Sequence, residues 1–281
     1  MEHVELRVGD LVFDARAAGP VDGELVLLLH GFPQTSWSWR HQLAALGAAG
    51  YHAVAPDQRG YSPGARPAGV EEYRSDRLVR DVLGVADALG GDRFHLVGHD
   101  WGGAVAWQVA GRHPDRLRTL TSVSTPHPAA FRRSIQDGEQ RDRSSYMLFF
   151  RSPEAEPFFL NDDAAGLRSL YASSALASDA VEEYVRVLTQ PGAMTGALNW
   201  YRAADPGLVA GLGPITTPTL YVWSTWDPAL GREAAEATAQ HVDGPYRFEV
   251  LEGVSHWIPE EAPDSLNAFL LEHLAGGTAG P

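Results

Sequence analysis

A buried strand, a sharp turn and a helix follow one another in the segment FHLVGHDWGGAVAW, residues 94–107. Residues 94–97 are apolar, as in a short strand, and the pattern becomes helical from Trp101 onward. The turn between them, Gly98-His99-Asp100-Trp101-Gly102, has the spacing of a strained strand-to-helix turn that exposes one side chain at the top of a sheet. The fold must therefore present Asp100 at the end of a buried strand.

The rest of the chain alternates strand and helix patterns, which indicates a parallel sheet. The run ELVLLLHG is apolar throughout, as expected of a strand that is buried on both faces. HVELRV and LVFDARAAG read as an opening hairpin, and strand patterns return late in the chain with TPTLYVWS and YRFEVLEG. We expect an α/β fold with a mostly parallel central sheet and helices on both faces.

A long segment interrupts this alternation. Residues 127–213 have helical patterns, are rich in Tyr and Phe, and contain no convincing strand. Because the strand pattern resumes afterwards, we expect residues 127–213 to form an inserted helical cap. Residues 1–126 and 214–281 then form the core domain, and a chain of 281 residues is long enough for such a core with an insertion.

Composition limits the classes of function. The formal net charge is −14 and there is no basic cluster, which argues against nucleic acid and against an anionic membrane surface as partners. The chain has no cysteine, which excludes disulfides, thiolate metal sites and cysteine nucleophiles. No metal-binding, phosphate-binding or dinucleotide-binding motif is present, so we expect no metal and no cofactor.

The sequence also bears on location. No apolar run approaches the roughly 18 residues that a membrane helix needs. The first residues, MEHVELRVGD, are too acidic for a signal peptide, so we expect a cytoplasmic protein. The residues predict no particular oligomeric state.

Three candidate catalytic residues each follow a predicted strand. Asp100 follows FHLVGH, Asp227 follows LYVWSTW, and His256 follows FEVLEGVS. In parallel sheets ligands bind outside the carboxyl ends of the strands, so we expect these three side chains to converge at that edge. No carboxylate follows TSVSTP, the alternative strand end for an acid, which leaves Asp227 as the best candidate.

The turn at 98–102 resembles the G-x-S-x-G nucleophile elbow of α/β-hydrolases, with aspartate in the position of the serine. The chain order of nucleophile, acid and histidine is also the order in that fold. An oxyanion hole would then use the backbone N–H groups of Trp101 and Phe32. The second of these lies in LLLHGFPQTSWSWR, where Pro33 is a candidate for a cis peptide bond.

An aspartate at the elbow favours attack on a saturated carbon. Its carboxylate is ionised at neutral pH and needs no base to become a nucleophile. Attack on a carboxylic ester would give an anhydride, which offers little advantage, whereas attack on an sp³ carbon gives an alkyl ester. His256, oriented by Asp227, can then activate water to hydrolyse that ester. The substrate therefore carries an epoxide oxygen or a halide as its leaving group.

Motifs along nearly the whole chain resemble those of the α/β-hydrolase-fold epoxide hydrolases: HGFP, DQRGY, GHDWGG, YMLFF, NWYR and GVSHW. In that family two cap tyrosines hold and protonate the epoxide oxygen, and the matching positions are Tyr146 and Tyr201. The resemblance implies an enzyme that turns a small apolar epoxide and water into a vicinal diol. The residues that we expect to line its substrate pocket are Phe32, Trp101, Phe150, Trp200 and Trp257.

Two other functions stay open. Haloalkane dehalogenases also resemble GHDWGG and Trp101 fits them, but Phe32 stands where they often carry Asn. A ligand sensor on the same scaffold would keep the fold but would often lack a catalytic residue. Ser224 stands where members of the epoxide hydrolase family commonly have Gly, three residues before the acid. Asp57 and Arg59 are expected to be structural and to pair near their loop.

Overall fold

The computed structural model describes residues 1–136, 139–172, 174–204 and 212–278. Eight strands form one sheet in the order β1-β2-β4-β3-β5-β6-β7-β8. β1 pairs antiparallel with β2, and β2 with β4, while the remaining neighbours are parallel. The predicted α/β fold with a mostly parallel sheet is therefore confirmed. The strands are β1 (Glu2–Val8), β2 (Leu11–Ala18), β3 (Leu25–Leu29), β4 (His52–Pro56), β5 (Phe94–His99), β6 (Leu117–Val123), β7 (Thr219–Ser224) and β8 (Tyr246–Leu251).

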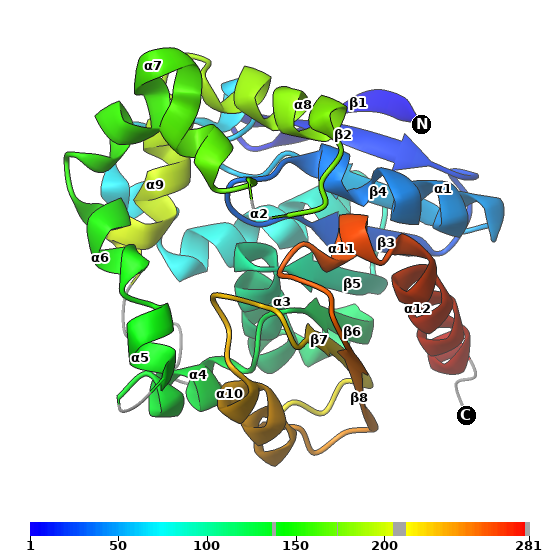
Figure 1. Ribbon diagram of the computed structural model, residues 1–281. Coiled ribbons are helices and arrows are strands. Elements are labelled where there is room, and N and C mark those ends of the chain that lie inside the picture. The colour runs from blue at the N-terminus through cyan, green and yellow to red at the C-terminus, as the bar shows by residue number, and fades with distance from the viewer. Residues whose placement is uncertain (137–138, 173, 205–211, 279–281) are drawn as a thin grey trace.

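Helices cover both faces of the sheet, and a further group of helices lies between β6 and β7 in the sequence (Figure 1). Those outside this group are α1 (Arg40–Ala48), α2 (Ser75–Ala88), α3 (Trp101–Arg112), α10 (Arg232–Ala237), α11 (Ile258–Glu261) and α12 (Pro263–Thr278). The inserted group is α4 (Pro128–Ser134), α5 (Glu139–Arg143), α6 (Tyr146–Arg151), α7 (Ala155–Ser169), α8 (Ser178–Leu188) and α9 (Ala193–Ala203). In Figure 1 this group lies along the left side and the top, away from α12.

Strand β3 explains why its sequence is apolar at every position. Leu25, Leu27 and Leu29 pack into the core beneath α2 and α3, whereas Val26 and Leu28 pack into the core beneath α1 and α12. All five side chains are buried. Because successive side chains of a strand point to opposite faces, a strand with a core on each side needs apolar residues throughout.

The turn after β5 is strained, as its spacing predicted. Asp100 has φ 52° and ψ −121°, a backbone conformation that residues other than glycine rarely adopt. The flanking glycines make the turn possible, because a Cβ at Gly102 would lie 2.1 Å from the carbonyl oxygen of Leu29, and one at Gly98 would lie 2.3 Å from that of Gly102. The helix α3 therefore starts close against β3 and β5, and the Asp100 side chain stands at the carboxyl edge of the sheet.

Two tyrosines of the inserted group bond to the sheet region. The Tyr171 hydroxyl donates to the carbonyl oxygen of Pro33 at 2.6 Å, and the Tyr184 hydroxyl donates to Glu260 Oε1 at 2.6 Å. The helices that follow β6 are thus held over the loop that follows β3. None of the described helices is long and apolar enough to cross a membrane.

The expected pairing of Asp57 with Arg59 was wrong. Arg59 forms two hydrogen bonds of 2.6 Å with the Asp81 carboxylate of α2. Asp57 instead accepts the backbone N–H of Ser36 at 2.7 Å. Both side chains are structural, but the packing of α2 against the loop brings a carboxylate that the local sequence pattern did not reveal.

Candidate active site

Asp100, Asp227 and His256 meet at the carboxyl edge of the sheet, after β5, β7 and β8. His256 Nδ1 donates to Asp227 Oδ2 at 2.7 Å. His256 Nε2 lies 3.6 Å from Asp100 Oδ2. The histidine therefore stands between two carboxylates, with one ring nitrogen toward each.

Asp227 is held rigidly. Its side chain is fully buried, and its Oδ1 accepts the backbone N–H groups of Ala229 at 2.8 Å and Leu230 at 2.9 Å. Ser224, in place of glycine, ends the strand before the Asp227 turn without a positive φ, and its hydroxyl donates to the carbonyl oxygen of Ser255 at 2.7 Å. Because Oδ1 accepts the two backbone N–H groups, Oδ2 is the oxygen that faces His256.

His99 and Ser124 hold the backbone of His256, a contact that the sequence did not reveal. His99 Nε2 donates to the His256 carbonyl oxygen at 2.8 Å, and the Ser124 hydroxyl donates to the same oxygen at 3.1 Å. Burial, together with the nearby charge of His256, lowers the pKa of His99 to about 4. His99 is therefore a neutral donor at neutral pH.

The charges of the site are strongly coupled. Burial alone would raise the pKa of Asp100, but the adjacent positive charge of His256 holds it below its usual value. Burial alone would lower the pKa of His256, but the carboxylates of Asp227 and Asp100 raise it to about 10. At neutral pH the site thus holds two carboxylates around one imidazolium.

Backbone N–H groups surround the Asp100 carboxylate on its other side. Phe32 N–H donates to Asp100 Oδ1 at 2.8 Å, and the N–H of Trp101 also contributes to the low pKa of Asp100. The Phe32–Pro33 peptide is cis. Gly31 permits this approach, because a Cβ there would lie 2.3 Å from Asp100 Cβ. One carboxylate oxygen therefore sits among N–H donors and the other faces His256.

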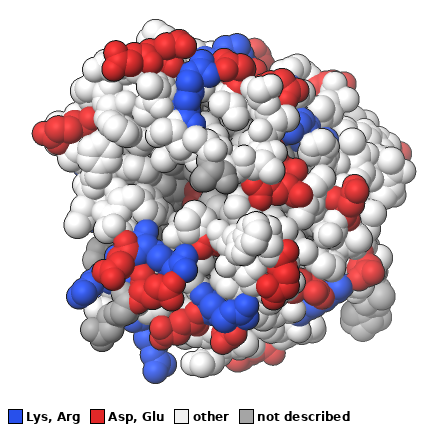
Figure 2. Space-filling model, viewed as in Figure 1, with Lys and Arg blue, Asp and Glu red and all other residues white. Residues whose placement is uncertain are grey.

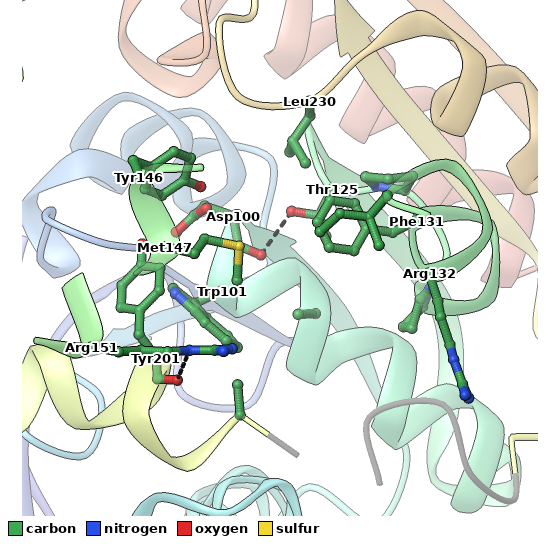
Figure 3. Close-up of a pocket in the computed structure, with 15 residues that line it drawn as sticks. Asp100, Trp101, Thr125, Phe131, Arg132, Tyr146, Met147, Arg151, Tyr201 and Leu230 are labelled. Carbon is green, nitrogen blue, oxygen red and sulfur yellow. Dashed lines mark hydrogen bonds between the residues drawn. The ribbon is translucent and has the colours of Figure 1, made fainter. Parts of the chain in front are cut away.

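Tyr146 and Tyr201 line the same cavity as Asp100. Their ring centroids are 6.4 Å apart, and in Figure 3 the Tyr146 hydroxyl is turned toward Asp100. Burial, reinforced by the negative charge of Asp100, raises the pKa of Tyr146, and burial with the neighbouring Tyr146 and Asp100 raises that of Tyr201. Both phenols therefore keep their protons at neutral pH and can donate them.

The cavity has a volume of about 420 Å³ and a largely apolar wall. Tyr146, Met147 and Tyr201 form one side, and residues of α4 and of the loop before it form the other (Figure 3). The lining residues are Asp100, Trp101, Ala104, Thr125, Pro126, Pro128, Phe131, Arg132, Ile135, Tyr146, Met147, Arg151, Tyr201, Ala204 and Leu230. Such a space suits a small apolar molecule.

The expected pocket residues need a correction. Of the five, Trp101 lines the cavity, whereas Phe32, Phe150, Trp200 and Trp257 do not. Phe32 and Phe150 pack against the ring of Tyr201, with centroid distances of 5.4 and 5.0 Å, and Trp200 packs against Trp101 at 5.9 Å. Trp257 packs on His256 at 5.1 Å. Phe32, Phe150 and Trp200 thus support side chains that form the wall, and Trp257 supports His256.

Among the residues that the structure describes, no group of three His, Asp or Glu side chains is placed to hold a metal ion. Acidic and basic side chains are intermixed on the face shown in Figure 2, and the surface over α6 is largely uncharged. The polar groups gathered at this site are the Asp100 carboxylate, the His256 imidazole, two phenols and backbone N–H groups.

Comparison with known proteins identifies the family of the chain. Residues 24–263 match the alpha/beta hydrolase fold family. Epoxide hydrolase 4 of Mus musculus is 36% identical over 279 residues, covering 95% of this chain and 77% of the relative, and epoxide hydrolase A of Mycobacterium tuberculosis is 34% identical, covering 92% of each chain. The crystal structure of the Bacillus megaterium epoxide hydrolase in complex with an inhibitor has a TM-score of 0.88 at 30% identity and covers 97% of this chain and all of that one. The chain belongs to the α/β-hydrolase-fold family and, within it, to the epoxide hydrolases.

Proposed function

We propose that this enzyme hydrolyses small apolar epoxides through an ester of Asp100. One observation carries the choice of an epoxide over a halide: two protonated phenols, that of buried Tyr201 and that of partly buried Tyr146, share an apolar cavity with the nucleophile. A departing halide needs no proton, whereas an opening epoxide leaves a basic alkoxide that does. The other features of the site serve both chemistries.

In the first step the Asp100 carboxylate attacks an epoxide carbon. The carbon–oxygen bond of the ring breaks, and Tyr146 or Tyr201 gives its proton to the alkoxide oxygen. We assign the attack to Oδ2, because Oδ1 accepts the N–H of Phe32 at 2.8 Å. The product is an ester of Asp100 with a free hydroxyl group on the neighbouring carbon.

Ester formation prepares His256 for the second step. The imidazolium of the resting enzyme is stabilised by the charges of Asp227 and Asp100. The ester carries no charge, so the pKa of His256 falls and its proton restores the phenol. Neutral His256, held by Asp227, then takes a proton from water as general base.

The hydroxide attacks the carbonyl carbon of the ester. The oxyanion that develops on Oδ1 is stabilised by the N–H groups of Phe32 and Trp101. Collapse of the tetrahedral intermediate returns the Asp100 carboxylate and passes a proton to the departing alkoxide, which leaves as a vicinal diol. No metal or cofactor takes part in this proposal.

We also propose that α4 to α9 form a cap on a core made of residues 1–126 and 214–281. The position of α4 to α9 supports this division, because they form one continuous insertion between β6 and β7 that Tyr171 and Tyr184 join to Pro33 and Glu260. The cap would supply both phenols, and the core the nucleophile, the histidine and the acid. The largely apolar wall of the cavity favours a neutral substrate.

A substrate panel with Tyr→Phe variants tests the proposal. The wild type should open aryl and alkyl epoxides and turn over matched alkyl bromides poorly. Replacing both Tyr146 and Tyr201 with Phe should slow alkylation of Asp100 by about 10²–10⁴, and each single replacement should slow it less, because one phenol still donates. A folded double variant that opens epoxides at the wild-type rate would contradict the acid role, and preferred turnover of bromides would favour a dehalogenase.

A further inference from the structure

Helices α6 and α9 each carry one of the two phenols. Tyr146 is the first residue of α6, and Tyr201 lies in the last turn of α9. The Phe150 ring lies between them, with its centroid 5.0 Å from each tyrosine ring. The distance between the two hydroxyls therefore depends on how these two helices are held together.

Two arginines cross between the ends of these helices. Arg151, the last residue of α6, donates from Nε to the backbone carbonyl oxygen of Tyr201 itself at 2.9 Å, which Figure 3 shows as a dashed line. Arg202 of α9 donates from Nη2 to the carbonyl oxygen of Ser152, the residue that ends α6, at 3.4 Å. Each helix thus supplies a guanidinium to the end of the other.

These two arginine contacts have a physical basis in the unsatisfied carbonyl groups at the C-terminus of a helix. The last four carbonyl oxygens of a helix have no N–H partner within it, and the negative end of the helix dipole attracts a cation. Tyr201 is among the last four residues of α9, so its carbonyl oxygen needs an outside donor. Arg202 is fixed by Glu156, with Nη1 2.8 Å from Oε1, whereas Arg151 has no ion pair among the described residues.

We infer that Arg151 is a positioning residue for epoxide opening, which holds the Tyr201 end of α9 against the Tyr146 helix and so sets the spacing of the two phenols. The inference rests on the proposed function, because it assumes that the phenols protonate the epoxide oxygen. Arg202 supports the same junction from the other side. Arg151 acts through Tyr201 and transfers no proton.

The test is Arg151→Met, which keeps the apolar stem and removes every donor. Single-turnover alkylation should slow by about ten- to a hundredfold, the cost of displacing a catalytic group by about 1 Å. Hydrolysis of the preformed ester should stay within about twofold of wild type, because that step uses His256 and the N–H groups. Arg151→Lys, which keeps a donor and a charge, should recover part of the alkylation rate.

A double-mutant cycle with Tyr201→Phe separates positioning from general damage. If Arg151 acts through the Tyr201 hydroxyl, Arg151→Met should slow alkylation much less in the Tyr201→Phe background than in the wild type. The matched control is Arg168→Gln on α7, since Arg168 also donates from Nε to a backbone carbonyl, that of Asp163, but lies outside the cavity lining. This control should alkylate at the wild-type rate.

Other results would overturn the inference. Alkylation at the wild-type rate in Arg151→Met, equal slowing of alkylation and hydrolysis, or the same slowing in both backgrounds would each show that Arg151 does not position the phenol. If Tyr201→Phe and the double Tyr→Phe variant both alkylate normally, the acid role itself fails, and the failure belongs to the proposed function.

Discussion

Asp227→Asn should change Nε2 of His256 from a base into a hydrogen-bond donor. The structure shows why the side-chain amide of the asparagine has only one favourable orientation. Oδ1 of Asp227 accepts two backbone N–H groups, those of Ala229 and Leu230. An asparagine must place its carbonyl oxygen there, because its NH₂ group would leave both N–H groups facing another donor. The NH₂ group then faces His256 Nδ1, which must accept and so loses its proton.

This change blocks the second step more than the first. The proton of neutral His256 moves to Nε2, the nitrogen that faces Asp100 at 3.6 Å, where a base is required. General-base catalysis contributes about 10²–10⁴ in rate, so we expect ester hydrolysis to slow by that factor, or about 3–5 kcal/mol of barrier. The Asp100 carboxylate keeps its charge and its N–H donors, so alkylation should persist and the ester should accumulate.

Rapid-quench mass spectrometry measures both steps. Asp227→Asn should show a burst of enzyme with the full mass of the substrate added, followed by slow decay. Asp87→Asn serves as control, because Asp87 is an exposed carboxylate that pairs with Arg116 at the surface. Hydrolysis of the ester within tenfold of the wild-type rate in Asp227→Asn would refute the assignment of Asp227 as the residue that orients His256.

Two further predictions concern stability. Asp81→Ala removes both short hydrogen bonds of the buried Arg59 and leaves it only the longer ion pair with Glu72 at 3.8 Å, so the free energy of unfolding should fall by about 3–5 kcal/mol, measured by urea titration; a loss below about 1 kcal/mol would contradict it. Burial lowers the pKa of His99 to about 4 and that of His127 to about 3. As the pH drops below about 6.5, these two histidines therefore bind protons in the unfolded chain before they do so in the folded one. The free energy of unfolding should then fall between about pH 6.5 and pH 4. His127→Asn, which still accepts the N–H of Ala129, should weaken this dependence, and an unchanged pH profile would count against it.

The sheet and the catalytic edge could be predicted from the sequence because they follow from local patterns and one geometric rule. A strand that is apolar at every position must be buried on both faces, as β3 is. Residues that follow parallel strands must meet at one edge, whatever their separation in the sequence. That rule sufficed to bring Asp100, Asp227 and His256 together.

The residues of the cavity wall could not be predicted in the same way. They depend on how α4, α6 and α9 pack against one another, and local sequence patterns do not reveal that packing. Phe131 of α4 and Ile135, the residue after α4, line the cavity, and Leu230 does so from the loop before α10. Phe150, chosen because it is aromatic, faces the rings behind the wall instead. An aromatic residue near a site supports the wall as readily as it forms it.

Polar contacts between residues far apart in the sequence could not be predicted for the same reason. Arg59 bonds to Asp81, and Arg151 bonds to the backbone of Tyr201, fifty positions along the chain. A guanidinium has a long, flexible stem, and nothing in the residues beside it specifies its partner. Only the packed structure selects one acceptor among many.

The most direct test of the mechanism is a single turnover in ¹⁸O-labelled water with enzyme in excess over epoxide. If Asp100 forms an ester that water cleaves at its carbonyl carbon, the label enters the Asp100 carboxylate. The tryptic peptide of residues 94–112 should then be heavier by the mass difference between one ¹⁸O and one ¹⁶O, and the first diol should carry no label. A labelled diol with an unlabelled peptide would mean that water attacks the epoxide directly, and Asp100 would not be the nucleophile.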